Sequence, residues 1–127
     1  MSKHHLPIAL CAALAAVHVS GARAAEDPML KLASTSGCLT CHHLERGAKG
    51  PDGLAPVGPA WRDVAVKYAR DKEAAANLTH TVMTGSNPYA SHWKGKVSGL
   101  AMPPNEVAIS EADARKLVNW ILALERK

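Results

Sequence analysis

The chain has 127 residues, of which 20% are charged, and a formal net charge of +4 at pH 7. This length accommodates one domain with a modest core. Its positive charge is not gathered into the patch or stripe that nucleic-acid binding requires, so we expect no nucleic-acid partner.

The N-terminal segment has the pattern of a secretory signal peptide. A short stretch with Lys3 precedes residues 6–19, which are mostly apolar but too short to span a bilayer comfortably, and Ala22-Arg23-Ala24 offers a cleavage site. We therefore expect a signal peptide at residues 1–24 and a mature domain at residues 25–127 without a membrane span. An uncleaved N-terminal anchor is the alternative.

A first helix is expected to begin at Asp27 and Pro28, because Asp can cap the free amides and Pro is tolerated at the first helical position. Gly37 is expected to end this helix. Cys38 follows directly. The helix therefore leads straight into the most informative segment of the chain.

That segment is Cys38-Leu39-Thr40-Cys41-His42, a C-x-x-C-H run of the kind that attaches a c-type haem. Two thiols at this spacing can each add to one vinyl group of the same porphyrin, and His42 can then supply the proximal imidazole. Two other uses remain open. A redox dithiol goes with a βαβ pattern, which we do not find, and a structural zinc site needs a second group of ligands.

Residues 47–59 form a loop rich in Gly and Pro, and no regular element is expected in it because Pro cannot donate a backbone hydrogen bond. A haem-ligating His normally donates its other ring N–H to an acceptor. We expect the carbonyl of Pro59 to accept this hydrogen bond from His42. A plain connecting loop is the alternative.

Three more helices are expected, the first over residues 61–68, the second capped by Asp71 and ending at Gly85, and the third capped by Ser110, with Asp113 completing a near-capping box. Their apolar positions have the spacing of a buried helical face. These positions are Trp61, Val64, Ala65 and Tyr68; Ala74, Leu78 and Val82; and Ala114, Leu117, Val118 and Ile121. The expected fold is all-α, with four short helices and two long loops wrapped around one covalent haem.

The second long loop, residues 86–104, contains Met102 followed by two prolines. Because the prolines would hold the sulfur in place, we expect Met102 to be the second axial ligand of the iron, and a thioether ligand favours Fe(II). We also expect Asn105 to donate a hydrogen bond to this sulfur. His80 and His92 are the rivals for this position.

A set of segments spread over the mature chain carries a resemblance. They are Glu26-Asp27-Pro28, Gly37-Cys38-Leu39-Thr40-Cys41-His42, Val57-Gly58-Pro59-Ala60-Trp61, Asp63-Val64-Ala65-Val66-Lys67-Tyr68, Gly85-Ser86 before Trp93, Met102-Pro103-Pro104-Asn105 and the closing helix with Trp120. In this combination the chain resembles the short bacterial class I cytochromes c, which carry a single haem in the periplasm.

This resemblance implies covalent haem c on Cys38 and Cys41, with His42 and Met102 as the metal ligands. It also implies that Pro59, Trp93 and Asn105 support the cofactor and its ligands. For Trp93 we expect an N–H donated to a haem propionate, with simple loop packing as the alternative. The loop at residues 44–56 is longer than in the most compact members of the family.

The function implied is a periplasmic one-electron Fe(II)/Fe(III) carrier that is not an enzyme. Its redox partners would be a periplasmic dehydrogenase or reductase, or a terminal oxidase. Lys49, Lys94 and Lys96 lie in the loops expected to surround the haem edge, where they could steer an acidic partner. Ordinary solvated surface lysines are the alternative. The alternatives are a haem subunit of a periplasmic dehydrogenase, for example a sulfite-oxidising one, and a haem sensor or peroxidase-like enzyme with an open iron.

Overall fold

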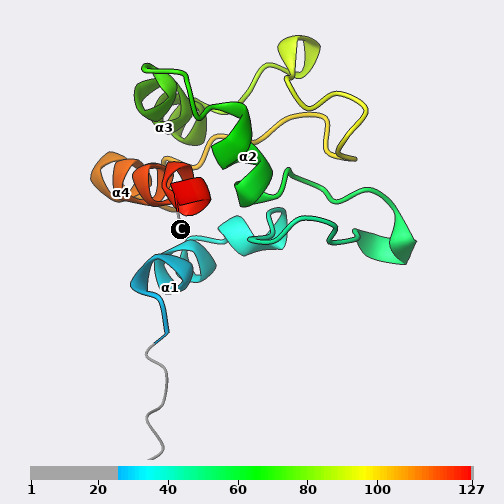
Figure 1. Ribbon diagram of the computed structural model, residues 1–127, viewed down its shortest axis with the longest axis horizontal. Helices are drawn as coiled ribbons and strands as arrows, with labels where there is room; N and C mark the ends of the chain where they lie inside the picture. Colours follow the sequence, from blue (N-terminus) through cyan, green and yellow to red (C-terminus); the bar gives the residue numbers. More distant parts are fainter. Residues whose placement is uncertain (1–25, 127) are drawn as a thin grey trace, which may run out of the picture.

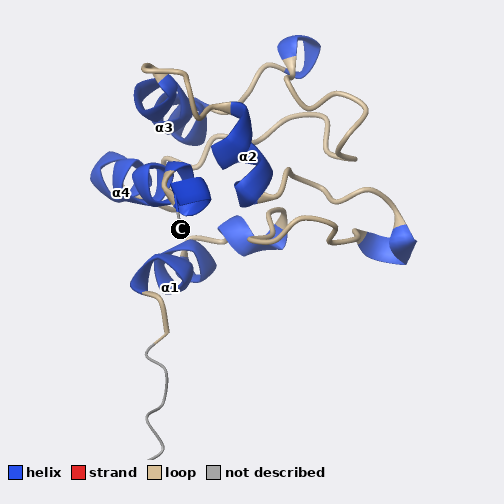
Figure 2. Ribbon diagram, viewed as in Figure 1, coloured by secondary structure: helices blue, strands red, loops and turns tan. Residues whose placement is uncertain are grey.

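The computed structural model describes residues 26–126, and the expected signal peptide at residues 1–24 lies outside this range. Within the described range, α-helices and single 3₁₀ turns alternate with long loops, and there is no strand (Figures 1 and 2). The four α-helices are α1 (Pro28–Thr35), α2 (Trp61–Lys67), α3 (Ala74–Thr84) and α4 (Glu111–Leu122). The all-α class is thereby confirmed. None of the helices between residues 26 and 126 has the length and apolar character to cross a membrane.

Helix α1 begins as predicted, and its cap has a second role. Asp27 is the N-cap, and its Oδ1 accepts a hydrogen bond from the Met29 amide at 2.8 Å. The other carboxylate oxygen accepts from the indole Nε1 of Trp120 at 3.2 Å. One carboxylate therefore both caps α1 and ties it to α4. After α1, Gly37 adopts a left-handed conformation with φ +74°, and the 3₁₀ turn η1 (Cys38–Thr40) follows at once.

Helix α4 is the centre of the packing. It contacts α1, α2 and α3, and in Figure 1 it lies between α1 and α3. Ser110 caps it as predicted, because its Oγ accepts from the Asp113 amide at 3.1 Å. The buried side chains of α2 and α4 all belong to the faces predicted from the spacing. They are Trp61, Val64 and Ala65 on α2 and Ala114, Leu117, Val118 and Ile121 on α4. Tyr68, predicted on the same face as Trp61, is instead the C-cap of α2 and is only partly buried.

Two local predictions are wrong in detail. Asp71 is not the N-cap of α3: its Oδ1 accepts from the Glu73 amide at 2.9 Å, so it closes a turn before the helix begins at Ala74. The loop at residues 47–59 is not wholly irregular, since it contains the 3₁₀ turn η2 (Pro51–Gly53). Pro51 stands at the head of this turn, where its missing N–H is not needed.

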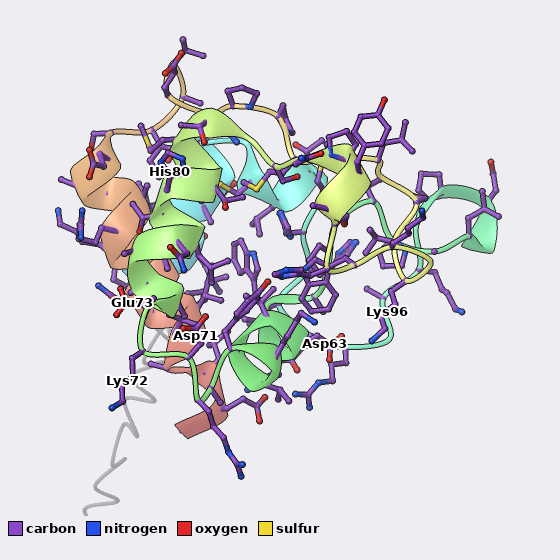
Figure 3. All side chains as sticks on the ribbon, turned by 90° about the horizontal axis from the view of Figure 1, so that it is seen from above. Asp63, Asp71, Lys72, Glu73, His80 and Lys96 are labelled. Atoms are coloured by element: carbon purple, nitrogen blue, oxygen red, sulfur yellow. The ribbon has the colours of Figure 1, made fainter. Side chains whose placement is uncertain are left out.

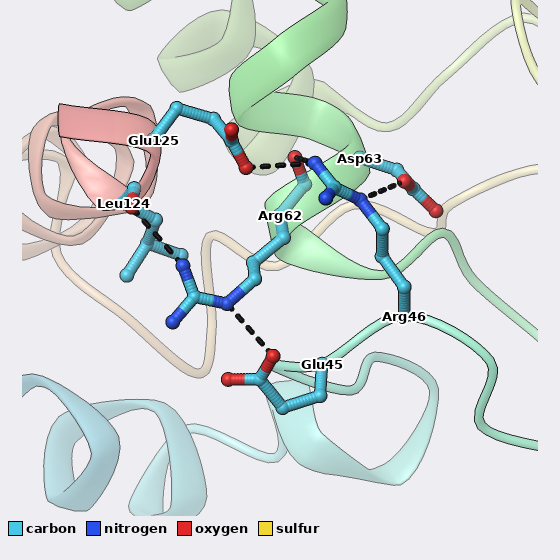
Figure 4. A network of polar contacts seen from close by, with 6 residues as sticks. All are labelled: Glu45, Arg46, Arg62, Asp63, Leu124 and Glu125. Atoms are coloured by element: carbon cyan, nitrogen blue, oxygen red, sulfur yellow. Dashed lines mark hydrogen bonds and ion pairs between the residues drawn. The ribbon is translucent and has the colours of Figure 1, made fainter. Parts of the chain in front are cut away.

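A polar network connects the segment that follows the C-x-x-C-H run to α2 and to the C-terminal turn η4 (Leu124–Arg126) (Figure 4). Its members are Glu45, Arg46, Arg62, Asp63, Leu124 and Glu125. Arg46 pairs with Asp63 at 2.6 Å and with Glu125 at 2.7 Å. Arg62 pairs with Glu45 at 2.8 Å and donates to the Leu124 carbonyl at 3.0 Å. The network therefore joins three segments that are distant in sequence: residues 45–46, helix α2 and turn η4.

Candidate functional site

A cavity of about 400 Å³ lies among the C-x-x-C-H segment, helices α2, α3 and α4, and the two long loops. Six of the predicted site residues line it: Cys38, Cys41, His42, Pro59, Trp93 and Met102. Apolar side chains supply much of the remaining wall. They include Val57, Trp61, Val64, Leu78, Val82, Leu117, Val118 and Ile121. Such a wall suits a large, mostly apolar cofactor.

Both cysteines of the cavity are half-buried, and they are not joined in a disulfide. A tight turn brings them to the same wall, because the Cys38 carbonyl accepts from the Cys41 amide at 3.3 Å and from the His42 amide at 3.0 Å. Burial raises the pKa of the Cys38 thiol, and Cys41 raises it further, against the opposing effect of a backbone hydrogen bond. Two thiols and one imidazole therefore face the cavity from a single turn of chain.

The imidazole of His42 is held in one orientation. Its Nδ1 lies 2.8 Å from the carbonyl oxygen of Pro59. A carbonyl can only accept, so Nδ1 carries the proton and Nε2 carries the free lone pair. Burial lowers the pKa of His42 and nearby His43 lowers it further, while the Pro59 hydrogen bond acts in the opposite direction. The ring also stacks on Trp61, with 6.0 Å between the centroids.

Gly58 is part of this site, although its contact with His42 was not predicted from the sequence. Its amide donates to the Cys41 carbonyl at 2.8 Å. A Cβ on Gly58 would lie 2.8 Å from Cε1 and 2.9 Å from Nδ1 of His42. The absence of a side chain is therefore what lets the loop approach the imidazole closely enough to present the Pro59 carbonyl.

Met102 lies on the cavity wall, in the loop that packs on the C-terminal end of α3. Asn105 anchors this loop: its backbone amide donates to the Val82 carbonyl at 3.0 Å, and its side-chain Nδ2 donates to the Pro103 carbonyl at 2.6 Å and to that of Val82 at 3.3 Å. These contacts hold the loop. A hydrogen bond from Asn105 to the Met102 sulfur stays a prediction.

Tyr68, His92 and Trp93 line another part of the cavity wall. The Tyr68 hydroxyl lies 2.7 Å from Nδ1 of His92, a contact that sequence reasoning missed because 24 residues separate the two. Burial raises the pKa of Tyr68, and the charge of Asp71 raises it further. The ammonium of Lys67 lies 5.4 Å from the centre of a Trp93 ring. His80 and His92 are the alternatives to Met102 as the second ligand. In the structure His92 is hydrogen-bonded to Tyr68, and His80 is exposed on α3 (Figure 3).

The family model of cytochrome c matches residues 30–125. This chain belongs to the cytochrome c family. Cytochrome c-551 of Allochromatium vinosum is 42% identical to it over 95 residues, which are 75% of this chain and 84% of the relative. Cytochrome c-552 of Nitrosomonas europaea is 37% identical over 94 residues, which are 74% of this chain and 76% of the relative.

The fold of the cytochrome agrees with this assignment. It superposes on the crystal structure of wild-type Nitrosomonas europaea cytochrome c552 with a TM-score of 0.58 and 37% identity, over 75% of this chain and 98% of the other. The protein is a short class I c-type cytochrome, as the resemblance implied.

The cofactor follows from the family and from the cavity. The cytochrome binds haem c covalently, and Cys38 and Cys41 fit the attachment motif. The cavity fits this group, because both thiols open into it beside an imidazole and a mostly apolar wall. The cytochrome is a small electron-transfer protein rather than an enzyme, and it acts with redox partners. The relatives do not favour the dehydrogenase subunit, the sensor or the peroxidase.

Proposed function

We propose that the cytochrome is a one-electron carrier whose haem iron is ligated by His42 and Met102. The observation that carries this proposal is that both side chains line one cavity, and that the Pro59 carbonyl leaves Nε2 of His42 as the free nitrogen. A soft thioether opposite an imidazole raises the reduction potential of a haem.

The bound haem supplies the chemistry, since its iron can alternate between Fe(II) and Fe(III). The chain's own residues then have three tasks. His42 and Met102 would hold the iron through the same two donor atoms in both states. The buried side chains of α2 and α4, such as Trp61 and Leu117, exclude water. The Pro59 carbonyl orients the imidazole and raises its basicity as a ligand.

We assign supporting roles to two further residues. Trp93 lines the cavity, and in this proposal its indole N–H donates to a haem propionate. Asn105 sits three residues after Met102 and holds the loop against α3 through the Val82 carbonyl. In this proposal its amide also lies within reach of the Met102 sulfur when haem is bound.

The proposed location is the periplasm, reached through a signal peptide at residues 1–24. Support comes from the N-terminal pattern of Lys3, the apolar stretch and Ala22-Arg23-Ala24. The proposed partners are a periplasmic dehydrogenase or reductase and a terminal oxidase. Mass measurement of the protein recovered from the periplasmic fraction gives a direct test, with a mature N-terminus at Ala25 expected. Recovery of the full-length chain in the membrane fraction would contradict the proposal.

A redox titration followed by visible absorption tests the proposed ligation. We expect a single one-electron transition, a haem that acid acetone does not extract, and in the ferric protein the charge-transfer band of a thioether–iron bond. Carbon monoxide binding by the reduced protein at neutral pH would show an open iron and would contradict ligation by Met102.

A further inference from the structure

One residue pairs both backbone polar groups of Met102. The Met102 amide donates to the hydroxyl oxygen of Ser86 at 2.8 Å, and the Met102 carbonyl accepts from the Ser86 amide at 2.9 Å. Sixteen residues separate the two in sequence. This reciprocal pair is the direct link between the Met102 backbone and the chain that leaves α3.

The neighbours of Met102 in sequence cannot replace this link. Pro103 and Pro104 have no backbone N–H to donate. On the other side of the contact, Gly85 ends α3 with φ +84°, and a Cβ on it would lie 3.0 Å from the Met102 carbonyl oxygen. The close approach that brings Ser86 to Met102 therefore depends on a glycine immediately before it.

The chain beyond Met102 is anchored to a rigid element. The amide of Asn105 donates to the carbonyl of Val82 in the last turn of α3, at 3.0 Å. The loop is thus tied to the same helix end at two points, Ser86 and Val82. Of the two, only Ser86 bonds the backbone of Met102 itself.

We propose that Ser86 is a positioning residue for the axial thioether. Its hydroxyl fixes the Met102 backbone so that the side chain keeps its place on the cavity wall, which opposes displacement of the sulfur by an external ligand. This inference rests on the proposed ligation by Met102 and names the residue that maintains it.

The test is competition by imidazole for the ferric iron, in which the iron–sulfur bond breaks and an iron–nitrogen bond forms. Ser86→Ala leaves the Met102 amide without its acceptor. We expect imidazole to bind about tenfold more tightly to this variant than to the wild type, since one orphaned amide is worth about a factor of ten. We also expect a weaker thioether–iron charge-transfer band and a lower reduction potential. Ser86→Thr keeps a hydroxyl and should restore all three.

Ser98→Ala is the matched control. Ser98 lies in the same long loop, and its hydroxyl also makes a hydrogen bond, to the Pro56 carbonyl at 3.3 Å. We expect this variant to bind imidazole as the wild type does. All measurements are made on the haem-loaded protein well below its unfolding temperature, so that general loss of stability does not enter.

The outcomes separate this inference from the proposed ligation. If wild-type ferric protein shows no thioether–iron band, the ligation by Met102 is wrong and this inference falls with it. If the band is present and Ser86→Ala binds imidazole as the wild type does, only the role of Ser86 is wrong. If Ser86→Ala does not fold, hydrogen exchange of the wild type decides: a protected Met102 amide supports the role, and an unprotected one overturns it.

Discussion

Gly58 and His42 approach so closely that a methyl group on the glycine would lie 2.8 Å from Cε1 of the imidazole. The same glycine precedes Pro59, whose carbonyl accepts from Nδ1 of His42. Replacing Gly58 by Ala should therefore push the ring and this carbonyl apart. We expect a loss of about 1–3 kcal/mol in the free energy of unfolding from overpacking. The reduction potential should rise, because a weaker hydrogen bond makes the imidazole a poorer donor to iron.

Gly95→Ala is the control for this substitution. Gly95 has φ +76° and no neighbour within 4 Å of a built Cβ, so Ala there should cost about 1–2 kcal/mol from backbone strain alone. It should leave the potential unchanged. Equal potentials for the two variants would contradict the role assigned to the contact between Gly58 and His42.

Much of the local structure was predictable from the sequence because it depends on neighbouring residues. The cap at Asp27 and the C-x-x-C-H turn belong to this class. The interaction of Pro59 with His42 spans 17 residues, yet chemistry suggested it, since a ligating His needs an acceptor. Other contacts depend on how distant segments meet. The closeness of Gly58 and the reciprocal bonds of Ser86 have no signature in spacing or composition.

Replacing Met102 by Leu removes the sulfur while roughly conserving volume, so the change in packing alone should cost less than about 1.5 kcal/mol. The free energy of unfolding should fall by more than this, because the proposed iron–sulfur bond is lost as well. The reduction potential should fall and the thioether–iron band should vanish, because a thioether favours Fe(II). Met83→Leu is the matched control, since Met83 packs against the core from α3. A Met102→Leu protein with the wild-type potential would exclude Met102 as the ligand.

The network of Figure 4 predicts that Arg62 stabilises the fold more than an ordinary surface arginine does. Arg62 bonds Glu45 and the Leu124 carbonyl, and 31% of its side chain is exposed. We expect Arg62→Ala to lower the free energy of unfolding by about 1 kcal/mol, measured by urea unfolding. Arg115→Ala breaks the exposed pair with Glu111 and should cost no more than about 0.5 kcal/mol. Equal costs would show that the connection to Leu124 adds nothing.

The raised pKa of Tyr68 should make the free energy of unfolding depend on pH in the alkaline range. Its pKa is raised by burial and by Asp71, so the folded state holds the phenol proton more tightly than the unfolded chain does. The resulting stabilisation is complete below the unfolded pKa of about 10 and is lost as the pH rises through the folded pKa. Tyr68→Phe should remove this loss, and at neutral pH it should cost about 1 kcal/mol for the bond to His92. Tyr89→Phe is the control, since Tyr89 is 93% exposed. If the free energy of unfolding falls equally at alkaline pH in the wild type and in Tyr68→Phe, the proton held by Tyr68 is not the cause of the loss.

If lysines near the haem site steer an anionic partner, Lys96 should affect the rate of electron transfer more than a lysine far from that site does. Lys49 and Lys96 line a smaller cavity that shares Pro59 and Trp93 with the main one, so their charges lie beside the haem site. Lys72 lies well away from Lys96, near the start of α3 (Figure 3). Oxidation of the reduced protein by hexacyanoferrate(III), a small anion, should be slower at low salt for Lys96→Glu than for Lys72→Glu, although both change the net charge equally. Raising the ionic strength should bring the two rates together. Equal rates at low salt would mean that only net charge acts and that these lysines do not steer.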